Sequence, residues 1–196
     1  MNSGRSAVAQ HCRDYAQRLG AILESAQWDA VADLAAELKA CWSDGRQVFI
    51  CGNGGSAANA SHLANDFLYG ISKQLGSGIR ISALSANPSV LTCLANDCGY
   101  DAIFSMQLAV QARAGDVLIA LSGSGNSPNI VSALEQARTM QLKTYAIVGY
   151  DGGKTKAMAD VPIHFDVHDM QISEDLQLIV GHMVMQWLAQ HPADKR

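Results

Sequence analysis

"QVFICGNGGSAANASHLAND", residues 47–66, contains the pattern that decides the fold. QVFIC is typical of a buried strand, and a glycine-rich turn follows it directly. A helix then opens near Ser56, so that free backbone N–H groups and the helix N-terminus surround one small volume. The stretch therefore predicts a strand, an anion-binding turn and a helix, in that order.

Four more β-rich runs follow, and helical segments separate them. They are IRISA (79–83), VLIAL (117–121), KTYAIV (143–148) and VPIHF (161–165). Their hydrophobicity is continuous rather than alternating, which indicates strands covered on both faces. The sequence therefore predicts an α/β fold, a doubly wound five-stranded parallel sheet of flavodoxin-like type.

Two helices are expected before the first strand, over residues 6–44 with a break at 25–28, because apolar residues recur there at helical spacing. A chain of 196 residues supports one well-buried core, and no repeat or linker interrupts it. We therefore expect a single domain, 1–196, with an N-terminal helical hairpin (1–45) and an α/β core (46–196). A last helix is expected to begin near Ser173, as its N-cap, and to end near Gln190.

A second glycine- and serine-rich loop, SGSGNS (122–127), follows the third predicted strand. In a doubly wound sheet, ligands bind beyond the carboxyl ends of the strands, where both loops are expected. The loops lack the lysine of a nucleoside triphosphate site, and "GNGGSA" does not match the dinucleotide fingerprint. A sugar monophosphate is therefore the expected ligand, although each loop alone is equally explained as a tight connection.

The composition excludes several classes of protein. The net charge is −4 and no Lys/Arg cluster occurs, which argues against nucleic acid. Five cysteines without a CxxC pair favour a reducing compartment, and no signal peptide or membrane span is recognised. Only 16% of the residues are charged, which suggests that other subunits cover part of the surface. We expect a cytoplasmic oligomer.

The helix after the first loop carries an imidazole and a carboxylate one turn apart. Asn59, His62 and Asp66 share one face of it. Moving a proton between adjacent carbons of a sugar needs such an acid and base. A solvated polar face is the simpler alternative, and the position behind a phosphate loop favours the functional interpretation.

The last predicted helix is apolar on two sides, which is typical of a helix packed between two layers. Its second face carries Glu174 and His182. Glu174 is equally explained as a first-turn carboxylate that the helix dipole favours. His182 is equally explained as a buried histidine with its hydrogen bonds satisfied.

Several blocks resemble the sugar isomerase (SIS) domain family, most closely its phosphoheptose isomerase branch. They are CGNGGSAANASH (51–62), ANDCGYDAIFSMQL (95–108), LSGSGNS (121–127) and GYDGGK (149–154). The resemblance implies a homotetrameric isomerase that converts sedoheptulose 7-phosphate into D-glycero-D-manno-heptose 7-phosphate through an enediol. It also implies a role in lipopolysaccharide or capsule biosynthesis.

The same resemblance implies the residues of the site. Asp66 and His182 would form the catalytic acid/base pair, and zinc would bind His62, Asp66, Glu174 and His182. The substrate would be held by the following residues: Asn53, Gly54, Ser56, Asn96, Asp97, Ser122, Ser124, Ser127 and Glu174. For Asn96 and Asp97, ordinary turn chemistry explains the residues equally well.

The chain departs from the family pattern at three positions of the site. Asp66 replaces a glutamate and is one methylene shorter, Glu174 replaces a glutamine, and Gly70 stands where an arginine is expected. A displacement of about 1 Å at a catalytic carboxylate can cost ~10²-fold in rate. The substrate is therefore less firmly indicated than the fold.

Two other functions stay open on the sequence alone. One is an isomerase that acts on another sugar phosphate, which Gly70 favours. The other is a non-catalytic SIS protein that binds a protein partner, as the replication-initiator-associated homologue does. Both histidines and both carboxylates are present, and this counts against the non-catalytic alternative.

Overall fold

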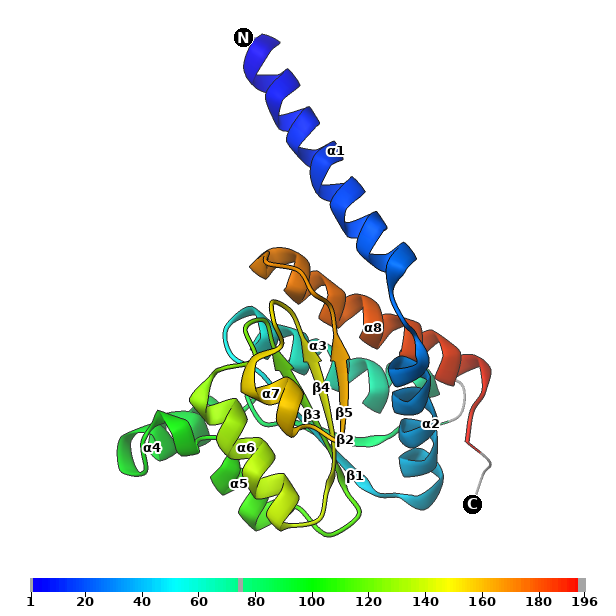
Figure 1. Ribbon diagram of the computed structural model, residues 1–196. Coiled ribbons are helices and arrows are strands. Elements are labelled where there is room, and N and C mark those ends of the chain that lie inside the picture. Colours follow the sequence, from blue (N-terminus) through cyan, green and yellow to red (C-terminus); the bar gives the residue numbers. More distant parts are fainter. Residues whose placement is uncertain (1, 74–75, 194–196) are drawn as a thin grey trace.

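The fold is an α/β sandwich, described by a computed structural model over residues 2–73 and 76–193 (Figure 1). The strands are β1 (Gln47–Cys51), β2 (Arg80–Ala83), β3 (Val117–Ser122), β4 (Lys143–Val148) and β5 (Val161–His164). The helices are α1 (Asn2–Ser25), α2 (Asp29–Asp44), α3 (Gly55–Leu68), α4 (Pro88–Asp97), α5 (Ser105–Gln111), α6 (Pro128–Thr139), α7 (Gly153–Met158) and α8 (Met170–Gln190). Two short 3₁₀ turns, η1 (Gly70–Ser72) and η2 (Tyr100–Ala102), complete the order.

The five strands form one parallel sheet in the order β2-β1-β3-β4-β5. All five lie where the β-rich runs predicted them, which confirms the predicted fold class. From β1 the chain builds outward to β2 on one side and then returns to β3 on the other. The strand order therefore reverses between β1 and β3, and a ligand is expected beyond the carboxyl ends of these two strands.

The sheet has a separate apolar core on each face, because successive side chains of a strand point to opposite sides. Helices α2, α3 and α8 cover one face, where they meet Val48, Ile50 and Ile119. Helices α5 and α6 cover the other face, where they meet Phe49 and Leu118. This double burial explains the continuous hydrophobicity of the strands.

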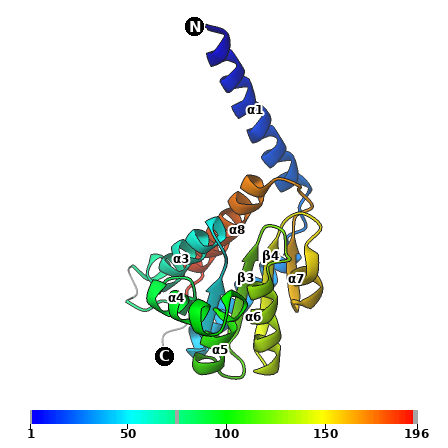
Figure 2. The same cartoon turned by 90° about the vertical axis from the view of Figure 1, so that its left-hand side faces the viewer.

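The two N-terminal helices are present, but α1 does not fold back along α2. It projects away from the rest of the chain in both views (Figures 1 and 2). In the described part of α1, the contacts to the rest of the chain come from its second half, where Tyr15 Oη donates to Asp175 at 2.5 Å and Arg18 pairs with Asp169 at 2.9 Å. The predicted break at 25–28 is correct, whereas the direction of α1 had no signal in the sequence.

Helix α8 begins at Met170, earlier than predicted. Asp169 is the N-cap residue, and its carboxylate accepts from the amides of Gln171 and Ile172. The hydrogen bond from the Ile172 amide is the main reason why the pKa of Asp169 lies below its usual value. Ser173 lies within the first turn and donates to the Asp169 carbonyl at 2.7 Å. None of the helices in the described part of the chain has the length and apolarity needed to cross a membrane.

The two buried cysteines are expected to resist alkylation in the folded protein. Burial raises the pKa of Cys41 and of Cys51 to about 12, because an apolar surrounding disfavours the thiolate. At pH 8 only about one in 10⁴ of these thiols would be the reactive thiolate. Iodoacetamide followed by mass spectrometry should leave Cys41 and Cys51 unmodified.

The exposed Cys12, on α1, provides the internal comparison for this experiment. In denaturant at the same pH, all five cysteines should react. Rapid modification of Cys51 in the folded protein would contradict its position in the core.

Candidate active site

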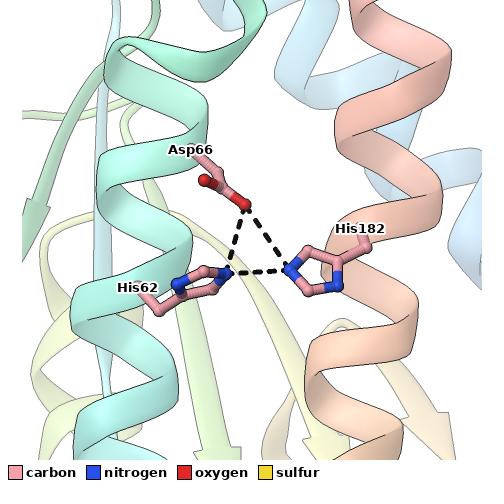
Figure 3. A group of neighbouring side chains, drawn as sticks. All are labelled: His62, Asp66 and His182. Atoms are coloured by element: carbon pink, nitrogen blue, oxygen red, sulfur yellow. Dashed lines mark hydrogen bonds and ion pairs between the residues drawn. The ribbon is translucent and has the colours of Figure 1, made fainter.

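His62, Asp66 and His182 converge on one point between α3 and α8 (Figure 3). The two Nε2 atoms of the histidines lie 2.9 Å apart. Asp66 Oδ2 lies 3.4 Å from His62 Nε2 and 3.5 Å from His182 Nε2. The single chain thus assembles this triad of side chains itself, from one i, i+4 pair and one residue distant in sequence.

Close packing of α3 against α8 brings His182 to the other two residues. A β-carbon added at Gly181 would collide with the Leu63 side chain, so only glycine permits this approach of the helices. Leu63 is itself 1% exposed and has little room to move. Gly181 directly precedes His182, and Leu63 directly follows His62. This contact therefore sets the separation of the two imidazoles.

The triad combines a covered carboxylate with accessible imidazoles. The Asp66 side chain is 16% exposed, whereas the side chains of His62 and His182 are 48% and 44% exposed. A ligand can therefore reach the nitrogen atoms from solvent, while the carboxylate is held behind them. This face of α8 packs on α3 of the same chain, where Gly181 lies against Leu63.

Glu174 lies apart from the triad. It does not belong to the described group of side chains whose ligand atoms converge at His62, Asp66 and His182. A β-carbon added at Gly55 would collide with its carboxyl group, so that group lies against the first residue of α3. Glu174 therefore faces the first loop rather than the point where the triad side chains converge.

The serine hydroxyls of both loops accept N–H hydrogen bonds. Ser56 Oγ accepts from Gln177 Nε2 at 3.0 Å, and Ser122 Oγ accepts from the Gly125 amide at 3.0 Å. Ser124 Oγ accepts from the Asn126 amide at 3.4 Å. A hydroxyl that already accepts keeps its proton to donate. The loops thus hold O–H donors ready for an anion; Ser127 is the N-cap residue of α6.

Asn53, a predicted site residue, pairs with Asn129, which the sequence did not single out, and this amide pair ties the two loops together. Asn53 and Asn129 exchange two hydrogen bonds of 2.8 Å each, and Tyr100 Oη also donates to Asn53 Oδ1 at 3.0 Å. Asn129 is 1% exposed. A buried amide requires hydrogen-bond partners. The only indication of this role in the sequence is that Asn129 stands in the first turn of the helix after the second loop.

Asn96 and Asp97 bond to each other at the exposed end of α4, with Asn96 Nδ2 donating to Asp97 Oδ1 at 2.7 Å. The described contacts do not join either residue to the triad or to the loops.

Gly54 is the N-cap residue of α3 and has φ = 55°, a left-handed conformation that glycine adopts at low cost. Gly70 lies beside Asp66 and Met185, where an arginine was expected from the resemblance.

The donor set of the triad fits zinc. Two imidazole nitrogens and one carboxylate oxygen are typical ligands of a catalytic zinc site, which keeps its fourth position open. The three atoms lie 2.9 to 3.5 Å apart, close enough for one ion to contact all of them after small movements. The predicted fourth ligand, Glu174, stands outside this set.

Zinc binding is expected to depend on both histidines. The His62→Ala and His182→Ala variants should each bind Zn²⁺ at least tenfold more weakly, because two remaining ligands hold the ion poorly. Isothermal titration of the metal-free protein measures this. His11→Ala, in the exposed part of α1, is the matched control and should bind as the unaltered protein does. Equal affinity in His182→Ala would refute a shared ion.

The helix contact at Gly181 is expected to control both stability and the triad. Gly181→Ala should destabilise the protein by about 1–3 kcal/mol, as overpacking does, and should weaken zinc binding. Gly20→Ala is the control, since a β-carbon there meets no atom within 4 Å. It should be neutral or slightly stabilising, because alanine is the better helix former. If thermal unfolding shows Gly20→Ala to be less stable than Gly181→Ala, the close contact of Gly181 with Leu63 is contradicted.

Comparison with known proteins places the chain among sugar isomerases. The sequence model of the SIS domain family matches residues 10–149. The phosphoheptose isomerase of Chlorobaculum parvum is 36% identical over 176 residues, which cover 88% of this chain and 83% of that protein. The phosphoheptose isomerase of Aliarcobacter butzleri is 33% identical over 184 residues, 93% of this chain and 95% of that protein.

The fold agrees with solved structures of the same kind. The phosphoheptose isomerase of Neisseria gonorrhoeae superimposes with a TM-score of 0.87 at 29% identity, covering 96% of this chain and 100% of that chain. The enzyme of that name from Francisella tularensis has a TM-score of 0.84 at 24% identity, covering 97% of this chain and 100% of that chain. The chain therefore belongs to the SIS domain family, in its phosphoheptose isomerase branch.

Proposed function

We propose that this protein is an aldose–ketose isomerase that converts sedoheptulose 7-phosphate into D-glycero-D-manno-heptose 7-phosphate. The observation that carries the proposal is the convergence of His62, Asp66 and His182 on the helix pair that also borders the serine loops. The names of the two relatives described above support the choice of substrate.

The spacing along α3 suits a phosphorylated sugar of this length. Ser56 and His62 are six residues apart on one helix, which corresponds to about 9 Å along its axis. A phosphate at the N-terminus of α3 would benefit from the helix dipole and from the outward hydroxyl protons. The other end of the sugar would then lie beside the triad.

The proposed reaction needs one base and one acid. Asp66 removes the proton from C1 of the ketose, and His182 donates a proton to the carbonyl oxygen at C2, which gives the enediol. Return of a proton to C2, with loss of the O1 proton, gives the aldose. Asp66 Oδ2 lies within 3.5 Å of both imidazoles, so a sugar that reaches the two histidines would also come within reach of this base.

Zinc, when bound, would polarise the substrate carbonyl as a Lewis acid. His62, Asp66 and His182 are the residues that would hold it. His182 offers a single converging nitrogen, Nε2, and that atom cannot coordinate an ion and donate a proton at the same time. The acid role of His182 therefore belongs to the metal-free site, so activity must be compared before and after chelation.

A different sugar phosphate is the second candidate, and Gly70 favours it. No side chain projects from this position, and Met185 fills the adjacent space beside Asp66. A substrate contact expected of the family is thus absent, which leaves the identity of the sugar less constrained at this position. The assembled triad counts against a non-catalytic role.

We also infer a homotetramer, a cytoplasmic location and a role in lipopolysaccharide or capsule biosynthesis. The unpaired half of α1 supports self-association, since Val8, on its apolar stripe, is 64% exposed. The stripe places Val8, Cys12, Tyr15, Leu19 and Ile22 at alternating spacings of four and three residues, the pattern of a coiled-coil seam. Helix α4 has no buried residue and offers a second surface for a neighbour.

Loss of the base or the acid should remove turnover without unfolding the protein. In chelated samples, Asp66→Asn and His182→Ala should each lower kcat about 10²- to 10⁴-fold, the usual contribution of one acid–base group. Asp14→Asn, on exposed α1, is the control. The assay follows aldose formation from sedoheptulose 7-phosphate, with a panel of other ketose phosphates beside it. Unchanged turnover in Asp66→Asn would refute its role as the base.

A further inference from the structure

Gln177 is a buried amide on α8 that the proposed chemistry does not use. It is 1% exposed and lies between the phosphate loop and the helix that carries His182. A buried amide is costly unless its donors and acceptor are satisfied. Its hydrogen bonds therefore indicate what the residue holds in place.

A backbone carbonyl fixes the direction of these hydrogen bonds. Asn59 Nδ2 donates to the Glu174 carbonyl oxygen at 2.9 Å, and a carbonyl can only accept. The same NH₂ group donates to Gln177 Oε1 at 3.0 Å. Gln177 must therefore turn its own NH₂ group the other way, where Nε2 donates to Ser56 Oγ at 3.0 Å.

This series of hydrogen bonds ends at the Ser56 hydroxyl, whose oxygen acts as an acceptor. Ser56 Oγ accepts from Gln177, so its single proton points elsewhere. Ser56 is 4% exposed and is the second residue of α3, where the backbone N–H groups have no helical partner. Among the residues that the structure describes, no acceptor takes this proton. It is thus available to an anion bound at this end of the helix.

We propose that Gln177 is a positioning residue for the substrate phosphate, because it forces the Ser56 hydroxyl to act as a donor. The inference rests on the proposed function, which places a phosphate at these loops. It adds a link between α8 and the phosphate site, which the loops alone do not provide. The helix that carries His182 also sets the polarity of the phosphate site.

Gln177→Glu tests the direction of the hydrogen bond between residue 177 and Ser56, with almost no change in the shape of the side chain. A carboxylate accepts from Ser56 and draws its proton away from the phosphate, and it adds a like charge nearby. Gln177→Met removes the donor but leaves the hydroxyl free to rotate toward the anion. Gln107→Glu, on α5, is the matched control, because Gln107 is also buried and its Nε2 donates to the carbonyls of Leu84 and Ile103.

The probe is inorganic phosphate, titrated into each folded variant and followed by calorimetry. We expect Gln177→Glu to bind about 10- to 100-fold more weakly, the usual range for loss of a hydrogen bond to a charged group. Gln177→Met should lie between this variant and the unaltered protein, and Gln107→Glu should bind normally. With sedoheptulose 7-phosphate, KM should rise in the same order, with a smaller effect on kcat.

The outcomes separate the two proposals. Normal phosphate binding by Gln177→Glu, or equal weakening in the Glu and Met variants, would overturn the positioning role alone. If Gln177→Glu does not fold, Gln177→Met decides, and affinity equal to that of the unaltered protein overturns the role. Failure of the unaltered protein to bind either phosphate or the sugar phosphate would overturn the proposed function and this inference together.

Discussion

The close approach of α3 and α8 is the contact on which the site depends. Gly181 has no side chain to hold the helices apart, and Leu63 fills the space against it. This contact lies beside His62 on one helix and beside His182 on the other. Because packed interiors tolerate little change in volume, a shift here would move the imidazoles directly. Packing in the core thereby controls the geometry of partly exposed, reactive groups.

The two ends of the site share these helices but use different physical means. At one end, α3 presents its N-terminus and the Ser56 hydroxyl, and Ser122 stands at the end of β3; both hydroxyl oxygens already accept N–H bonds. At the other end, titratable groups converge within hydrogen-bonding distance. Hydrogen bonds between Asn59, Gln177 and Ser56 tie α3 to α8 in the protein interior, next to the first loop. An anion bound at the loops would consequently lie in fixed relation to the triad.

Much of the fold could be predicted, because local sequence patterns record burial. The runs that became β1 to β5 are covered on both faces, and continuous hydrophobicity reports this directly. The direction of α1 could not be predicted, since a helix has the same local pattern whether or not it folds back. The start of α8 was predicted too late, because Asp169 and Ser173 are both plausible caps and only the backbone bonds distinguish them.

The sequence by itself determined the residue types, the loops at the strand ends and the i, i+4 spacing of His62 and Asp66, since helical periodicity fixes neighbours on one face. The family resemblance implied that His182 joins them, but only the tertiary structure shows that contact and shows that Glu174 faces Gly55 instead. It also revealed the partners of Asn129 and Gln177. The physical reason is that contacts between distant segments depend on how closely two helices pack, and a single chain's sequence does not encode that distance in any local pattern.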